Sequence, residues 1–312
     1  MVEMKKTRVG FGHGLVDAGE KYPNVVVLVG DLRDSTNVNF FAEKFPERFI
    51  EVGIAEQNMA NVAAGLSLTG KIPFFTTYGA FATCRCLDML RVTICYSNLN
   101  VKIGGAHGGI SVGPDGATHQ ALEEISILRS LPNMKVIVPC DYYETRKATL
   151  AAIDIDGPVY IRFGRENVPV VTSEDSVFKF GEGVLYRDGG DAAILACGVM
   201  LYEALEAAGE LEKEGIDARV INIHTVKPID ENIITKAAVE CGAIVTAEEH
   251  QILGGFGSAV AEVVVRNKAV PMEFVGIKDS FGRSGKPDEL MAAYHLKAPD
   301  IITAVKKVLQ RK

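Results

Sequence analysis

The stretch "RFIEVGIAEQNMANVAAGL", residues 48–66, passes from a strand pattern to a helix pattern, and this step recurs along the whole chain. Residues 48–54 are typical of a short strand. The apolar residues that follow recur at helical spacing, at Met59, Val62, Ala63 and Leu66. A helix is therefore expected to begin at or near Glu56. A carboxylate there either stabilises the helix N-terminus or takes part in chemistry, and this stretch alone leaves both explanations open.

Strand and helix patterns alternate in both halves of the chain. Strands are expected at 24–31, 48–54, 100–105, 134–139 and 158–163, and then at 192–198, 217–224, 243–249 and 273–278. Helices are expected at 81–98 and 142–154, and around 200–214, 230–240 and 257–267. This order predicts an α/β fold in which mostly parallel sheets are flanked by helices.

Length and composition limit the class of protein. A chain of 312 residues exceeds one comfortable core, so we expect two domains, at 1–170 and 191–312, joined by a linker at 171–190. A net charge of -7 argues against a nucleic-acid or anionic membrane surface. We expect a cytoplasmic protein, because there is no signal-peptide pattern or long apolar run. The six cysteines lack CxxC spacing and are expected to be reduced, with no metal bound.

Titratable residues gather in the glycine-rich segment "GGAHGGISVGPDGATHQ", residues 104–120. Glycines let a backbone approach a ligand closely, although they also occur in flexible connections. The segment follows an expected strand, and ligands of parallel sheets bind at the carboxyl ends of strands. His107 and His119 could transfer protons near neutral pH, and Asp115 could hold a substrate hydroxyl. Each of them taken singly is explained equally well as a surface residue.

Arginines and aromatic residues beside the expected strands supply further candidates. Arg8 and Arg165 could each bind a phosphate through two hydrogen bonds, or could form surface ion pairs of little consequence. The segment "TTYGAF", residues 76–81, opens a helix with two aromatic rings that could pack in the core or stack on a flat ligand. Ser35 and Asp31 lie near the end of an expected strand.

Three motifs together resemble the transketolase group of thiamine diphosphate enzymes. They are "GIAEQNMA" (53–60), "DGATHQ" followed by "LRSLPNM" (115–120 and 128–134), and "VKPID" followed by "AEEHQILGGFGSAV" (226–230 and 247–260). The resemblance covers nearly the whole chain and implies a pyrimidine-binding domain followed by the transketolase C-terminal domain. It implies transfer of a two-carbon ketol group from a ketose phosphate to an aldose phosphate.

One motif of the group is missing. Long-chain members bind magnesium and the cofactor diphosphate through a Gly-Asp-Gly…Asn motif, and the nearest segment here is "VGDLRD", residues 29–34. The chain therefore resembles the carboxyl-terminal subunit of a split transketolase. This implies a separate N-terminal subunit that supplies the ligands of Mg2+, and self-association of this chain as a homodimer within an assembly of two copies of each subunit.

The resemblance also implies roles for individual residues toward the cofactor. Glu56 would hydrogen-bond a nitrogen of the cofactor pyrimidine, Phe81 would stack on that ring with Tyr78 beside it, and Asp31 would lie nearby. Cys84 stands where longer relatives carry an aromatic residue, which leaves the third wall of the pyrimidine pocket undefined.

Toward the substrate, the resemblance implies that His107 and His119 contact the reacting oxygens or hydroxyls. Asp115 would bind the hydroxyl next to the scissile bond. The sugar phosphate would be held by Arg8, Ser35, His107 and Arg165. The second-half residues Glu248, Glu249 and His250 match a family motif and are expected to be structural or interface residues.

Three alternatives stay open. Deoxyxylulose phosphate synthases share "GIAEQ" and "DGxTH" but are normally single long chains. The beta subunits of 2-oxoacid dehydrogenases have a similar length and subunit division, with poorer matches to "DGATHQ" (115–120). A relative that binds the cofactor without catalysis is the third alternative, because fold does not guarantee function. The presence of Glu56, Phe81, His107, Asp115 and His119 weighs against this last one.

Overall fold

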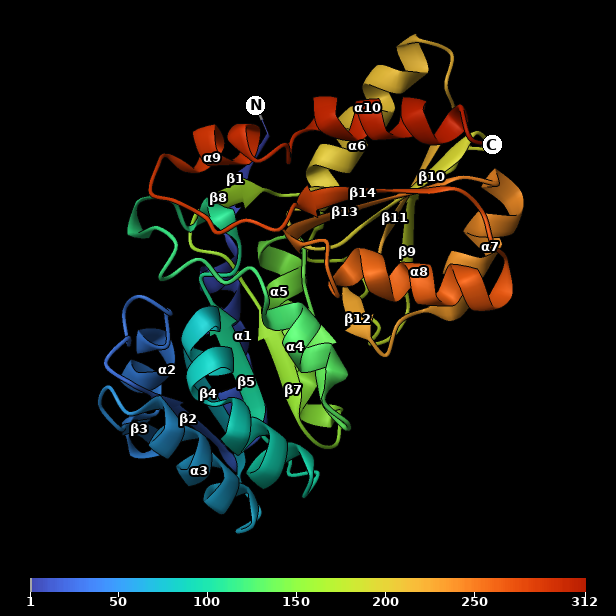
Figure 1. The fold of residues 1–312 in the computed structure, drawn as a ribbon. Coiled ribbons are helices and arrows are strands. Elements are labelled where there is room, and N and C mark those ends of the chain that lie inside the picture. The colour runs from blue at the N-terminus through green and yellow to red at the C-terminus, as the bar shows by residue number, and fades with distance from the viewer. Residues whose placement is uncertain (1) are drawn as a thin grey trace.

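The computed structural model describes residues 2–312 and has an α/β architecture built on two main sheets (Figure 1). The first sheet has seven strands in the order β12-β6-β7-β5-β4-β2-β3. They are β2 (Val25–Val29), β3 (Phe49–Glu51), β4 (Ile72–Tyr78), β5 (Lys102–Ala106), β6 (Lys135–Ile137), β7 (Val159–Arg162) and β12 (Thr225–Lys227). All the pairs are parallel except β12 with β6. The predicted fold class is therefore confirmed for this half.

The second sheet has five strands in the order β14-β13-β10-β11-β9, and only β9 is antiparallel to its neighbour. They are β9 (Val184–Arg187), β10 (Ala192–Ala196), β11 (Ala218–Asn222), β13 (Ile244–Gln251) and β14 (Met272–Ile277). A small antiparallel ribbon pairs β1 (Met4–Lys6) with β8 (Asn167–Pro169). The predicted parallel arrangement is confirmed here as well.

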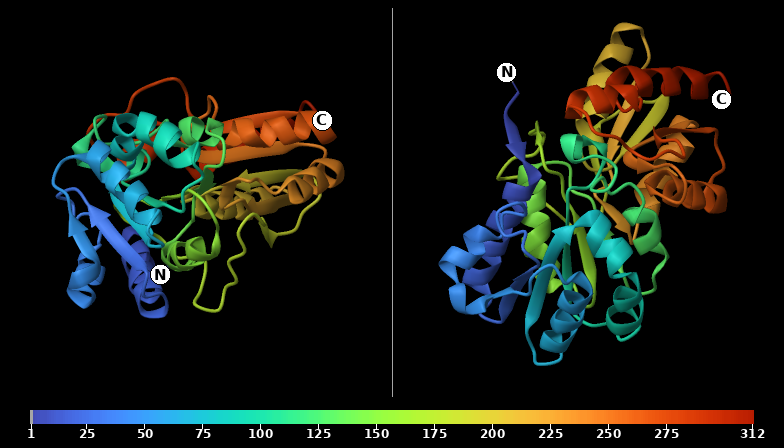
Figure 2. Two further views of the ribbon diagram at one scale, coloured as in Figure 1. Left: turned by 90° about the horizontal axis from the view of Figure 1, so that it is seen from below. Right: turned by 60° about the vertical axis from the view of Figure 1, so that its left-hand side comes forward.

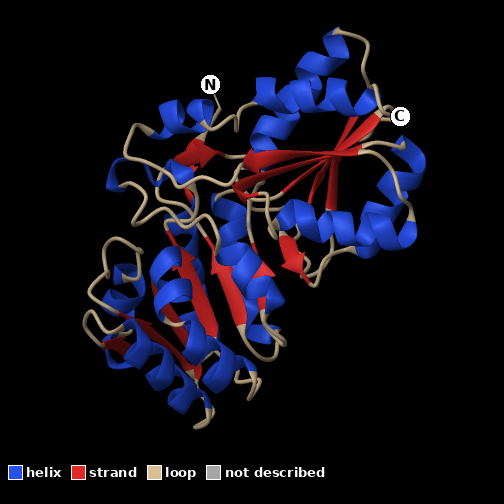
Figure 3. Cartoon of the chain, in the orientation of Figure 1, coloured by secondary structure: helices blue, strands red, loops and turns tan. Residues whose placement is uncertain are grey.

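Helices flank both main sheets (Figure 3). Those of the first half are α1 (Thr7–Lys21), α2 (Asn39–Lys44), α3 (Glu56–Ser67), α4 (Glu124–Ser130) and α5 (Tyr142–Ala151). Those of the second half are α6 (Met200–Lys213), α7 (Glu231–Cys241), α8 (Phe256–Asn267), α9 (Pro287–Ala293) and α10 (Ala298–Leu309). Among residues 2–312, none of these helices combines the length and the apolar character needed to cross a membrane.

Several elements differ from the sequence-based expectation. The central strand β4 and the helix α1 were not anticipated, and Arg8 lies in the first turn of α1, two residues after β1. The helix expected over 81–98 consists of two π-helical segments, Phe81–Arg85 and Met89–Cys95. Strand β9 falls in the stretch expected to be a linker, and β12 crosses from the second half to join the first sheet. The domain boundaries themselves stay a prediction.

The glycines of α1 allow this helix to pack closely against α5. A Cβ atom added to Gly10 would lie 2.3 Å from the carbonyl oxygen of Tyr142, and one added to Gly14 would lie 2.7 Å from that of Arg146. Both carbonyls belong to α5, so the two helices pack backbone against backbone. Glycine weakens a helix intrinsically, and here that cost is offset by a close contact that no larger residue permits.

The buried Arg162 side chain links the two halves of the molecule, which lie against each other in the views of Figures 1 and 2. Nε of Arg162 on β7 lies 2.5 Å from a carboxylate oxygen of Glu124, and the same guanidinium donates to the carbonyl oxygen of Glu249 on β13 at 2.8 Å. The Glu249 carboxylate accepts a hydrogen bond from the backbone N–H of Ser111 at 2.7 Å. A Cβ on Gly109 would lie 2.2 Å from that carboxyl group.

The glycine-rich segment therefore has a structural task. Gly109 has φ of +95°, and its lack of a side chain lets the segment lie on Glu249. Glu248 accepts hydrogen bonds from Phe256 and Gly257 at the start of α8, and His250 accepts one from Ile125. These contacts agree with the structural role expected for the acidic pair and His250.

Candidate functional site

Residues that the sequence analysis selected lie at the carboxyl edge of the first sheet. Five parallel strands end at this edge and lead into one candidate or pair each: β2 into Asp31, β3 into Glu56, β4 into Tyr78 and Phe81, β5 into His107, and β7 into Arg165. Adjacent parallel strands bring their carboxyl ends together, which is where α/β folds bind ligands. The sheet therefore gathers positions that are far apart in the sequence.

Four of the candidate side chains, those of Tyr78, Phe81, His107 and His119, form an aromatic cluster. The Tyr78 ring centre lies 4.0 Å from that of His107 and 5.5 Å from that of His119. The Phe81 ring centre lies 5.4 Å from that of Tyr78, with the two rings tilted, and 5.3 Å from that of His119, edge to face. The four rings therefore pack together in one cluster, and Phe81 also lines the pocket described below.

His107 is the most constrained member of the cluster. It is 2% exposed, its backbone is in the left-handed region at φ of 57°, and its Nδ1 atom has no hydrogen-bond partner within residues 2–312. Burial, helped by the charges of Arg8 and Arg165, lowers the pKa of His107 to about 3. The imidazole is therefore neutral at neutral pH. Its buried Nδ1 atom is free to pair with a ligand. A backbone held in the left-handed region, as at His107, is common at functional sites.

Glu56 is the first residue of α3, as the sequence predicted, and it is 6% exposed. The helix has no side-chain N-cap. A carboxylate oxygen of Glu56 instead accepts a hydrogen bond from Arg85 at 2.6 Å, and the Arg85 guanidinium lies over the Phe81 ring at 3.7 Å from its centre. The sequence analysis missed Arg85, whose only sequence signal was its position four residues after Phe81; the structure places both residues in one π-helical segment.

The residues expected to hold a phosphate form two contacts. Arg8 donates to the backbone oxygen of Ser35 at 2.9 Å, and Arg165 donates to a carboxylate oxygen of Asp115 at 3.0 Å. Burial and the charge of Arg165 lower the pKa of Arg8. The Nε atom of Arg8 is buried without a partner among residues 2–312. Two neighbouring cations with free donor capacity suit an anionic group.

In the described part of the chain, Asp31 is not in contact with the aromatic cluster. It is exposed, its φ is 58°, and its backbone N–H donates to the Glu51 carboxylate at 2.7 Å. The contacts among residues 2–312 do not join its side chain to the aromatic cluster.

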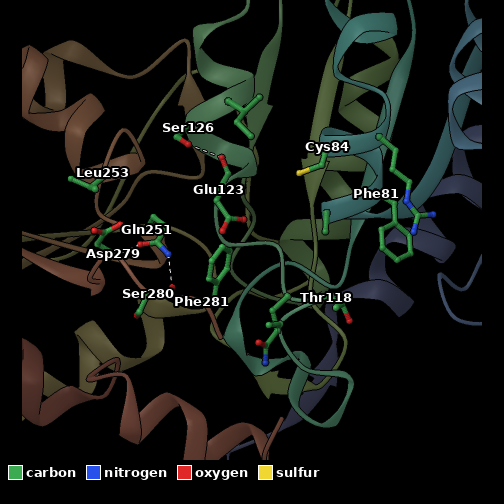
Figure 4. A pocket seen from close by; sticks show the side chains of 15 residues that line it. Phe81, Cys84, Thr118, Glu123, Ser126, Gln251, Leu253, Asp279, Ser280 and Phe281 are labelled. Atoms are coloured by element: carbon green, nitrogen blue, oxygen red, sulfur yellow. Dashed lines mark hydrogen bonds between the residues drawn. The ribbon is translucent and has the colours of Figure 1, made fainter. Parts of the chain in front are cut away.

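A pocket of about 760 Å³ opens beside Phe81, between the two halves of the molecule. Figure 4 shows Phe81, Cys84 and Thr118 on one side and Gln251, Leu253 and Asp279 on the other. The thiol of Cys84 is exposed on this wall, while the other five cysteines are buried, and all six are free. The sequence analysis missed the contribution of the second half, because nothing in the segment 279–281 marks it as part of a site.

Comparisons with known proteins agree over nearly the full length. Residues 3–171 match the family described as transketolase, pyrimidine binding domain, and residues 181–301 match the transketolase, C-terminal domain. A putative transketolase C-terminal section from Methanocaldococcus jannaschii is 43% identical, over 98% of this chain and 97% of that protein. A 6-deoxy-6-sulfo-D-fructose transketolase subunit from Clostridium sp. is also 43% identical, over 96% of this chain and 92% of that protein.

One solved structure is similar throughout. It is described as a split gene transketolase, inactive beta4 tetramer, and has a TM-score of 0.93 and 48% sequence identity over 98% of this chain and 99% of that one.

Proposed function

This chain belongs to the transketolase family, as its pyrimidine-binding and C-terminal domains show, and we propose that it is the catalytic carboxyl-terminal subunit of a split transketolase. The proposed reaction is transfer of a two-carbon ketol group from a ketose phosphate to an aldose phosphate. The observation that carries this proposal is the gathering of Glu56, Tyr78, Phe81, His107 and His119 at one sheet edge. The presence of His107 and His119 beside the residues proposed to bind the cofactor weighs against a relative without catalysis.

The residues present fit the pyrimidine end of thiamine diphosphate. The site offers an aromatic face on Phe81, a nearly buried carboxylate on Glu56 and an unpaired buried nitrogen on His107. When bound, the cofactor supplies the carbanion chemistry, and the protein supplies orientation and proton control. Glu56 would hold a proton at its carboxylate toward a ring nitrogen. Neutral His107 and the more exposed His119 would bind the oxygens of the substrate.

The opposite end of the substrate would meet the arginines. Arg8 and Arg165 would bind a terminal phosphate, helped by Ser35 and His107, while Asp115 would accept a hydrogen bond from a substrate hydroxyl. In the structure Asp115 is paired with Arg165, so the proposed substrate also has to satisfy Asp115 when the phosphate engages the arginine. The relative from Clostridium sp. is described as acting on a sulfonated sugar, so the terminal anion is a point at which family members differ.

Magnesium and the cofactor diphosphate are assigned to a separate subunit. Hard cations require oxygen ligands in a defined geometry, and this sequence has no Gly-Asp-Gly motif to supply them. The cofactor would therefore lie between two different chains.

Titration calorimetry with thiamine diphosphate and Mg2+ tests the cofactor assignment on this chain. We expect weak binding by the wild-type protein and a dissociation constant about tenfold higher for Phe81→Ala, since stacking of a base on an aromatic ring contributes about 1–3 kcal/mol. Tyr96→Ala is the matched control, because Tyr96 is an exposed aromatic residue that does not line the pocket beside Phe81. Equal binding by wild type and Phe81→Ala would remove the pyrimidine assignment.

The phosphate assignment predicts a split in kinetic constants for Arg165→Ala. In the assembled enzyme, KM for a phosphorylated sugar should rise at least about tenfold, the usual effect of losing a charge-assisted hydrogen bond. KM for the unphosphorylated sugar should change much less. Arg33→Ala, which breaks the exposed pair of Arg33 with Glu43, is the control. A similar rise for both sugars would contradict the phosphate role, and a preference for pyruvate as donor would favour a synthase.

A further inference from the structure

Arg85 touches both of the side chains that the proposed function assigns to the pyrimidine ring. One guanidinium nitrogen lies 2.6 Å from a carboxylate oxygen of Glu56, and the guanidinium carbon lies 3.7 Å from the centre of the Phe81 ring. A single planar cation thus donates a hydrogen bond to the carboxylate and covers an aromatic face. These are the two interactions that the pyrimidine would need.

We infer that Arg85 is a latch: its guanidinium occupies the place of the cofactor pyrimidine and has to leave before the ring can bind. The inference rests on the proposed function, since it takes Glu56 and Phe81 as the ring-binding residues. It adds a residue that opposes cofactor binding to a set in which the others favour it.

The surroundings of Arg85 allow this movement. Its side chain is 46% exposed, whereas that of Glu56 is 7% exposed and fixed at the first turn of α3. The side-chain amide nitrogen Nε2 of Gln57 donates to the backbone oxygen of Arg85 at 3.0 Å, so the backbone is held while the long side chain of Arg85 can change rotamer. Arg85 also lines the open pocket beside Phe81, which provides space for the displaced guanidinium.

The contacts of Arg85 with Glu56 and Phe81 stabilise the protein in the absence of the cofactor. A nearly buried carboxylate without a partner is unfavourable, and the guanidinium pairs with it while gaining a cation–π contact. A ligand that needs the same two groups binds only the open fraction of molecules, so its apparent affinity falls by that fraction. Lysine cannot reproduce both contacts, because it lacks the planar fork that stacks and donates together.

A second interpretation gives the opposite expectation. If Arg85 stayed in place and contacted the bound cofactor, its removal would weaken binding. The sign of the change in affinity therefore decides between a latch and a ligand-binding arginine.

The test is calorimetric titration of the full chain with thiamine diphosphate and Mg2+, and separately with thiamine, which lacks the diphosphate. For Arg85→Ala we expect a dissociation constant about tenfold lower than that of the wild type for both ligands. Arg85→Met, which keeps most of the length without the charge, should behave like Arg85→Ala. The dissociation constant of Arg85→Lys should fall between those of the wild type and Arg85→Ala. Arg91→Ala removes an exposed arginine from the next π-helical segment and should leave the affinity unchanged.

Alkylation of Cys84 gives a second readout without activity. Cys84 is the exposed cysteine among six and lines the same pocket. The thiamine diphosphate concentration that half-protects it from iodoacetamide should fall by the same factor in Arg85→Ala. Circular dichroism identifies any variant that does not fold, and Arg85→Met or Arg85→Lys then carries the comparison.

The outcomes separate the two levels of inference. If Phe81→Ala weakens binding but the folded Arg85 variants bind equally or more weakly than the wild type, the latch is wrong and the proposed function stands. If Phe81→Ala has no effect, the pyrimidine assignment fails and the latch fails with it. If wild-type binding is too weak to measure, the Arg85 variants should bring it into range, and their failure to do so overturns the latch.

Discussion

A Glu56→Gln variant of the assembled enzyme is expected to lose about 100-fold or more in turnover, the usual contribution of a general acid–base group. Glutamine keeps the shape of the side chain and most of its effect on the helix N-terminus. It cannot share a proton with a ring nitrogen of the cofactor. The measurement is kcat for ketol transfer at saturating substrates, with the melting temperature as a check on folding.

Glu231→Gln serves as the matched control for the helix effect. Glu231 is an acid in the first turn of α7, on the other half of the molecule, and it pairs with Arg266 at the surface. Loss of a first-turn acid typically costs about 0.3–1 kcal/mol of stability. If the two variants shared a small loss of stability and near-normal turnover, Glu56 would have only the capping role.

The fold could be predicted from the sequence where a strand was short and made mainly of apolar or small residues. This holds for β2, β5, β10 and β13, whose strands are fully or almost fully buried. It failed for β4, the strand between β2 and β5, because Pro73 lies inside it opposite Val26. Proline removes a backbone donor and usually argues against a central strand. The local pattern therefore contradicted a position that tertiary packing imposes.

Helix α1 escaped prediction for a similar reason. Its glycines lower helix propensity, and their purpose appears only when α5 is placed against them. No single-sequence rule distinguishes a glycine that ends a helix from one that permits two helices to touch.

The site was predictable where residues follow strands, because parallel strands share a carboxyl edge. Glu56, His107 and Arg165 were selected on that basis together with the family resemblance, whereas Tyr78 and Phe81 were selected as aromatic residues at the start of an expected helix. Their mutual contacts were not predictable, and neither was Arg85, whose importance depends on where its guanidinium lies relative to Glu56 and Phe81. Asp115 was expected to face the substrate, and the structure adds its ion pair with Arg165.

Subunit complementation is expected to produce the other large effect. We expect the purified chain to fold, to self-associate, to bind thiamine diphosphate weakly and to show no ketol transfer. The pyrimidine site supplies only part of the binding energy, since the cofactor is anchored mainly through its diphosphate and magnesium, whose ligands this sequence lacks. Mixing with a separate chain that carries the Gly-Asp-Gly…Asn motif should raise the rate of ketol transfer from background to a readily measured turnover.

The second chain is expected to be needed for closing the active site as well as for binding the cofactor tightly. Phe81, Arg85 and the pocket wall are open to solvent at the site where the cofactor would enter, and carbanion chemistry needs water to be excluded. A second chain seated over this opening would close it and bring the metal ligands at the same time. Light scattering should give a homodimer for this chain alone and an assembly with two copies of each subunit for the mixture, in keeping with closed two-fold symmetry. Ketol transfer by this polypeptide alone, with magnesium and cofactor present, would show that the division of the site between two chains is wrong.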